Sequence, residues 1–72
     1  MANQHVVPYG DQWAVRREGS DRVTSIHPTQ ADAIDKGRQI AINQHGELFV
    51  HRPDGTIRDR NSYGNDPARR PG

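Results

Sequence analysis

Residues 47–60, ELFVHRPDGTIRDR, decide the fold, because they combine two β-forming runs with a complete turn signal between them. Within that turn, Pro53 presets one backbone dihedral angle, Asp54 can hydrogen-bond back to the chain, and Gly55 accepts a positive φ. The stretch therefore predicts a β-hairpin in which Asp54 and Gly55 have structural roles.

A helix is predicted immediately before the hairpin, over residues 28–46, where the apolar period changes from two to about 3.6 residues. Thr29 is followed three residues later by Asp32, a variant of the capping box that makes Thr29 the N-cap. Gly46 lies just past the last periodic residue and is expected to form the left-handed C-terminal cap. The face predicted to pack against a sheet contains Ala33, Ile34, Gly37, Ile40, Ala41 and Gln44.

The middle of this helix contains Gly37, and a glycine there costs about 1 kcal/mol relative to alanine. The usual compensation is that a position without a side chain lets the helix approach the sheet closely. Gly37 is therefore predicted to be a structural contact point and not a hinge.

The N-terminal part of the chain predicts three antiparallel strands, in QHVVPYG (4–10), QWAVRRE (12–18) and RVTSIH (22–27). With the helix and the final hairpin, the order becomes β-β-β-α-β-β. This order predicts a two-layer α+β domain with one helix packed on one face of a sheet. The third and fourth strands should run parallel, and a right-handed crossover places the fourth strand beside the first.

The composition limits what such a domain can be. A chain of 72 residues holds one small domain, which buries only roughly 60% of the surface exposed in its unfolded state. The absence of cysteine excludes disulfides and thiolate metal sites, and the net charge of +1 does not by itself indicate nucleic acid. No apolar run is long enough to cross a bilayer and no export signal opens the chain, so we expect a cytoplasmic protein with no membrane partner.

Strand alternation assigns side chains to the two faces of the sheet. If Leu48, Val50 and Ile57 meet the helix, and Trp13 and Val15 do so on the second strand, arginines and a phenylalanine share the opposite face. Guanidinium groups neutralise phosphates and an aromatic ring stacks on a base, so this face suits DNA or RNA without sequence preference. The candidate nucleic-acid-binding residues are Arg16, Phe49, Arg58 and Arg60.

Two alternatives to nucleic-acid binding stay open for this face. An exposed charged surface is the default for a small domain, and its arginines can simply pair with Glu18 and Glu47. The same face, with Phe49 as an anchor, can instead form a homodimer or bind another protein. Binding through about four phosphates would weaken with salt at a log–log slope of roughly −3 to −4, whereas a protein contact would change little.

The sequence contains no pattern typical of an enzyme, a metal site or a cofactor site. The four histidines, including His51, lack metal-ligand spacing, and no glycine-rich phosphate loop or nucleophile elbow is present. Asp59 is predicted to face the helix side and to pair with Arg17, which is a structural role. We therefore expect no enzymatic activity, no cofactor, no metal and no small-molecule substrate.

Three segments, HVVPYGDQWAV (5–15), TQADAI (29–34) and VHRPDGTIRDRNSYGNDP (50–67), resemble the small bacterial proteins of the domain of unknown function 2188. The resemblance implies a compact bacterial domain and no established activity. It also implies that Tyr63, Gly64, Asp66 and Pro67 belong to the domain. The expected organisation is thus one domain over residues 1–67 and a flexible tail over residues 68–72, where Arg69 and Arg70 could add phosphate contacts.

Overall fold

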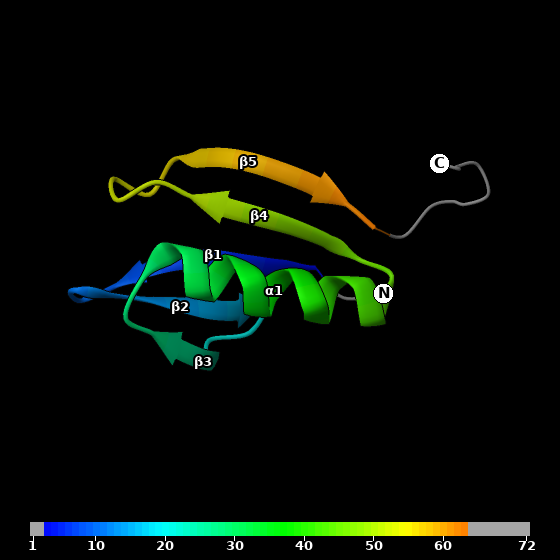
Figure 1. Cartoon of the computed structure of the whole chain (residues 1–72), viewed down its shortest axis with the longest axis horizontal. Helices are drawn as coiled ribbons and strands as arrows, with labels where there is room; N and C mark the ends of the chain where they lie inside the picture. Colours follow the sequence, from blue (N-terminus) through cyan, green and yellow to red (C-terminus); the bar gives the residue numbers. More distant parts are fainter. Residues whose placement is uncertain (1–2, 64–72) are drawn as a thin grey trace.

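A computed structural model describes residues 3–63 and confirms the β-β-β-α-β-β order (Figure 1). Five strands form one mixed sheet, and a single helix lies in front of it (Figure 1). The elements are β1 (Gln4–Tyr9), β2 (Gln12–Arg17), β3 (Val23–His27), α1 (Gln30–Gln44), β4 (Glu47–His51) and β5 (Ile57–Ser62).

The strand order is β3-β2-β1-β4-β5, so β4 lies beside β1 as predicted. β1 and β4 are parallel, while β1–β2, β2–β3 and β4–β5 are antiparallel pairs. The pairing of Val6 with Val50 and of His5 with Phe49 sets the register between the two halves of the sheet. Segments more than forty residues apart in sequence thus meet at the centre of the sheet.

The helix packs over β1, β2, β3 and β4, and its buried residues are Ala33, Gly37 and Ala41. Ile34 and Ile40 are half-buried, but Gln44 is exposed, so the packed face ends one turn earlier than predicted. Between helix and sheet lies a small core of Val6, Val15, Ala33, Ala41, Leu48 and Val50. Within residues 3–63 no element covers the opposite face of the sheet, and α1 is too short and too polar to span a bilayer.

The predicted N-cap is correct and the predicted C-cap is not. The backbone N–H of Asp32 donates to Thr29 Oγ1 at 3.1 Å. At the other end the left-handed residue is His45, with φ of 54°, and not Gly46. His45 N–H donates to the Ile42 carbonyl and Gly46 N–H to the Ala41 carbonyl, which is the Schellman arrangement. Gly46 is buried one position beyond the left-handed residue.

The final hairpin has the predicted turn. Gly55 has φ of 93°, and Asp54 Oδ1 accepts hydrogen bonds from both the backbone N–H and the hydroxyl of Thr56. The backbone hydrogen bond from Thr56 is the main reason why the pKa of the Asp54 carboxyl is lowered. After β5, Tyr63 packs against the core and its N–H donates to the Gly46 carbonyl, as expected of a residue within the domain.

Candidate functional site

The sheet face opposite α1, called the outer face, carries most of the exposed apolar side chains that the structure describes. Four large hydrophobic residues in residues 3–63 are exposed, and three of them lie on this face: Tyr9, Ile26 and Ile57. The fourth, Ile42, is on the helix. Ile26 and Ile57 lie on the two edge strands, so exposed apolar side chains recur across the width of one uncovered face, and a large uncovered apolar surface indicates an interaction site.

Strand register arranges most of the outer face in three rows that cross the strands, with the pair Tyr9 and Gln12 beyond the first of them. The apolar row consists of Ile26, Ala14, Val7, His51 and Ile57. The basic row beside it consists of Arg16, His5, Phe49 and Arg60. The acidic row consists of Glu18 and Glu47. Asn3 lies between these two residues, and Ser62 lies beside Glu47. The outer face is therefore graded from apolar to basic to acidic along the strands.

The centre of the basic row is an aromatic stack. The rings of His5 and Phe49 lie with centroids 4.9 Å apart and planes inclined by 18°. Both side chains are half-buried, since Arg16 and Arg60 flank them on the neighbouring strands. A flat, partly exposed surface of two stacked rings results, with one guanidinium on each side.

A chain of polar contacts runs diagonally across the three rows. His5 Nε2 is 3.0 Å from Glu18 Oε1, and His5 Nδ1 is 2.9 Å from His51 Nε2. His51 Nδ1 is in turn 3.0 Å from the carbonyl oxygen of Gly55. The hydrogen bond with His5 is the main reason why the pKa of the exposed Glu18 carboxyl is lowered. His5 was absent from the predicted site, although it lies at the centre of the face.

The two arginines of the basic row are partly engaged within the chain. Arg16 Nη1 donates to the Ser20 carbonyl at 2.9 Å. Arg60 Nε lies 4.0 Å from Glu47 Oε1, with the Arg60 side chain 65% exposed and the Glu47 side chain 36% exposed. The acidic row therefore offsets part of the positive potential that a phosphate would meet here.

Arg58 does not share the outer face, and its predicted place there is wrong. The β4–β5 register shifts between Val50 and His51: Val50 pairs with Asp59, but His51 pairs with Ile57. Arg58 is thus the extra residue of a β-bulge, which reverses the alternation before it. Ile57 points outward, while Arg58 Nη1 donates at 2.7 Å to Gln30 Oε1 at the start of the helix. Of the candidate set, Arg16, Phe49 and Arg60 remain together.

Asp59 faces the helix side as predicted, because it pairs with the inward-facing Val50. Its ionic partner is the neighbouring Arg58, with Nε and Oδ2 separated by 3.6 Å, and not Arg17. Arg17 belongs to β2, and two strands separate β2 from β5. The predicted pair is therefore impossible in this strand order. Asp59 is exposed, so it needs no buried partner.

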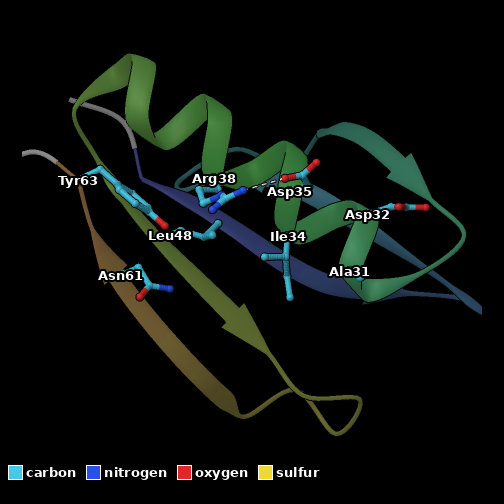
Figure 2. A pocket seen from close by; sticks show the side chains of 8 residues that line it. All are labelled: Ala31, Asp32, Ile34, Asp35, Arg38, Leu48, Asn61 and Tyr63. Carbon is cyan, nitrogen blue, oxygen red and sulfur yellow. Dashed lines mark hydrogen bonds and ion pairs between the residues drawn. The ribbon is translucent and has the colours of Figure 1, made fainter.

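A groove of about 490 Å³ opens on the helix side, between α1 and the C-terminal end of β5 (Figure 2). Figure 2 shows helix residues facing side chains from β4 and the end of β5. Asp35 is paired with Arg38 at 3.0 Å, and Leu48 lies at the base. Residues 3–63 contain no cluster of three His, Cys, Asp or Glu that could hold a metal ion. The lining residues are Ala31, Asp32, Ile34, Asp35, Arg38, Leu48, Asn61 and Tyr63.

The remaining predictions concern the C-terminal segment. Gly64, Asp66, Pro67 and the tail arginines Arg69 and Arg70 lie outside the described residues, as does the predicted boundary between domain and tail. The described part of the outer face therefore consists of the five strands and the turns that join them.

Residues 4–63 match the sequence profile of a family described as uncharacterised proteins conserved in bacteria, the domain of unknown function 2188. The chain belongs to this family. The uncharacterised protein YdaT of Bacillus subtilis (strain 168) is 37% identical to this domain-2188 chain over 54 residues. That alignment covers 75% of the chain and 36% of YdaT, so the chain spans little more than a third of the length of that relative. No solved structure matches the chain.

Proposed function

We propose that this protein is a non-enzymatic interaction module that pairs with a second copy of itself through the outer face. The observation that carries the proposal is the apolar row, which has an exposed isoleucine at each end and spans all five strands. Small domains gain stability when they cover such a surface: full burial of an exposed isoleucine contributes about 1.5–3 kcal/mol, and Ile26 and Ile57 still have 44% and 52% of their surface to bury.

The order of residues in the apolar row suits a symmetric pair. A two-fold axis parallel to β1 lays the row of one copy on the row of the other, with Val7 near the axis. Ile26 of one copy then lies over Ile57 of the second copy, and the same contact recurs at the other end. Isologous interfaces require this kind of self-complementary surface.

The absence of an enzymatic role is part of the same proposal. The outer face is a sheet surface, and the groove beside α1 contains carboxylates with no neighbouring nucleophile of the serine or cysteine kind. Catalysis needs titratable groups that converge on a reacting atom, in a site from which water is excluded. Surface binding through apolar side chains needs neither.

Nucleic-acid binding is the second candidate, and the stack of His5 on Phe49 favours it. Stacked rings flanked by Arg16 and Arg60 offer a platform for a base with a guanidinium on each side. The acidic row and the displacement of Arg58 weigh against it, because fewer free charges face the phosphates. We therefore rank it below self-association.

Self-association is expected to fail when a charge is placed at either end of the apolar row. Ile26→Glu and Ile57→Glu should each weaken the dimer by about tenfold or more, since a two-fold interface buries every residue twice. Sedimentation velocity over a concentration series measures the effect. Ile42→Glu is the matched control: its exposure of 48% lies between the 44% of Ile26 and the 52% of Ile57. A wild-type chain that stays monomeric at high concentration contradicts the proposal.

Nucleic-acid binding, if it occurs, is expected to perturb the basic row. A short DNA duplex and a single strand, added at low salt, should then shift the amide resonances of Arg16, Phe49 and Arg60. Replacing both arginines with glutamine should reduce the log–log salt slope by about two units. Arg38→Gln, on the exposed helix surface, is the control. Absence of shifts in the basic row removes this candidate and leaves self-association.

A further inference from the structure

Two histidine rings meet on the outer face, and their hydrogen bonds fix how many protons they carry. The outward partners are Glu18 Oε1 for His5 Nε2 and the Gly55 carbonyl oxygen for His51 Nδ1. A carboxylate and a carbonyl can only accept hydrogen bonds. His5 Nε2 and His51 Nδ1 must therefore both carry a hydrogen.

The two nitrogens that face each other are then the remaining ones, His5 Nδ1 and His51 Nε2, separated by 2.9 Å. In two neutral rings both of these nitrogens would present lone pairs, and no hydrogen bond could join them. One additional proton between them restores the bond. The pair then carries a single positive charge beside the negative charge of Glu18.

We propose that His5 and His51 share one proton and that the series Glu18–His5–His51–Gly55, called the proton latch, is closed only over a bounded pH range. The latch joins β1 and β4 to the turn after β2 and to the turn before β5. Its contacts all lie within one copy of the chain, so the latch does not require the proposed self-association, although His51 also belongs to the apolar row.

A metal ion is the other cation that could lie between two imidazoles. Metal sites use three or four protein ligands, as in catalytic and structural zinc centres. The described residues gather no third histidine, cysteine or carboxylate at this position. Glu18 already bonds the outer nitrogen of His5, so it cannot also reach an ion between the rings. The proton is the cation that the geometry favours.

Charged groups from every neighbouring segment act on the latch. The positive charges of Arg16 on β2 and Arg60 on β5 disfavour protons on the pair, whereas the carboxylates of Glu18 and Glu47 favour them. In the β4–β5 turn, Arg52 and Asp54 are both bonded to Thr56. The low pKa of the Glu18 carboxyl keeps it an acceptor through the range in which histidines change charge.

The proton latch opens both above and below this pH range. Above it, loss of the shared proton leaves two facing lone pairs, so a ring must turn and give up Glu18 or Gly55. Below it, a second proton places an N–H on both facing nitrogens, which breaks the contact between the rings. Acidification thereby adds one positive charge to the outer face and releases the β4–β5 turn from β1.

Ring nitrogen spectra of the full ¹⁵N-labelled chain, recorded from acid to alkaline pH, test the proposal. With the latch closed, His51 Nδ1 and His5 Nε2 should be protonated, and the two facing nitrogens should show intermediate shifts. Both rings should titrate in two linked steps, as coupled sites do. His27 and His45 serve as references in the same spectra. A protonated His51 Nε2 with a bare Nδ1 at every pH would overturn the latch.

Two variants distinguish a proton shared by His5 and His51 from two rings that are merely close together. His51→Gln should reduce the titration of His5 to a single step. Glu18→Gln keeps an acceptor oxygen but removes the negative charge beside the pair, so the shared proton should leave at a lower pH than in the wild type. The proposal is contradicted if His5 titrates in a single step with the same curve in the wild type and in both variants. If a variant fails to fold, the ring nitrogen spectra of the wild type still test whether the proton is shared.

Discussion

Replacing Leu48 with alanine is expected to remove about 2–5 kcal/mol from the free energy of unfolding. Leu48 is fully buried and is the largest completely enclosed side chain within residues 3–63. It lies between the helix and the sheet, where its Cδ1 approaches Gly37, and it forms the base of the helix-side groove. The buried positions of the helix are only alanine and glycine, so the helix directly above Leu48 has little side-chain volume with which to refill the space.

The effect of Leu48→Ala should be large relative to the total stability of the domain. At about 0.05–0.15 kcal/mol per residue, 72 residues give roughly 4–11 kcal/mol in all. Urea unfolding followed by the fluorescence of Trp13, which packs against the core, measures the change. Ile42→Ala is the control, since an exposed helix position should change stability by only about 0.5 kcal/mol. A cost for Leu48→Ala as small as that of the control would contradict the described core.

Local signals in the sequence were sufficient for most of the fold. The turn at Asp54 and Gly55, the N-cap at Thr29 and the change of period before the helix each act through neighbouring residues. The parallel placement of β4 beside β1 followed from the order of elements and the usual crossover. Such features can be predicted because each depends on a few adjacent side chains or on a general rule of topology.

The β-bulge in the last hairpin could not be predicted in this way. Alternation was counted from Ile57, which was assigned to the helix side, and this placed Arg58 on the outer face. The unpaired Arg58 interrupts the alternation, so Ile57 faces outward although Asp59 still faces the helix side. Nothing in that sequence marks the extra residue, because neither glycine nor proline occupies it. Because of the bulge, Arg58 leaves the outer face and Ile57 joins it. The outer face is therefore more apolar than predicted, and self-association replaces phosphate binding as the best candidate function.

The helix end shows the same limit on a smaller scale. Gly46 has the residue type that a left-handed cap favours, yet His45 adopts φ of 54° one position earlier. Histidine is among the residues enriched in this conformation, although less so than glycine. Gly46 is buried and its carbonyl accepts from the N–H of Tyr63, a contact with the far end of the chain that the local sequence does not reveal.

The proton latch depends on register between segments that the sequence does not align. His5 and His51 are 46 residues apart, and they meet only because His5 pairs with Phe49. A shift of one residue would turn His51 toward the helix and remove the contact. Adjacency of β1 and β4 was predictable, but register was not, so the pairing of these histidines could be found only in the folded chain.

Gly37→Ala is expected to destabilise the domain, although alanine is the better helix former. A Cβ at this position would lie 2.8 Å from Leu48 Cδ1 and 3.3 Å from Val6 Cγ2. Both partners are fully buried, so neither can move into solvent. Overpacking of a core costs about 1–3 kcal/mol, which outweighs the gain of about 1 kcal/mol in helix propensity. Urea unfolding should therefore show a lower midpoint for the variant.

A double-mutant cycle tests whether the contact with Leu48 is the cause. Leu48→Val shortens the side chain that the new Cβ meets, so Gly37→Ala should cost less in that background, with a coupling of about 0.5 kcal/mol or more. Comparison of Gln39→Gly with Gln39→Ala, at an exposed helix position, measures the propensity difference without a clash. If Gly37→Ala raises stability by the same amount as glycine to alanine does at position 39, the close approach of helix and sheet at Gly37 is refuted. Destabilisation that Leu48→Val relieves shows instead that the missing side chain sets the distance between the two layers.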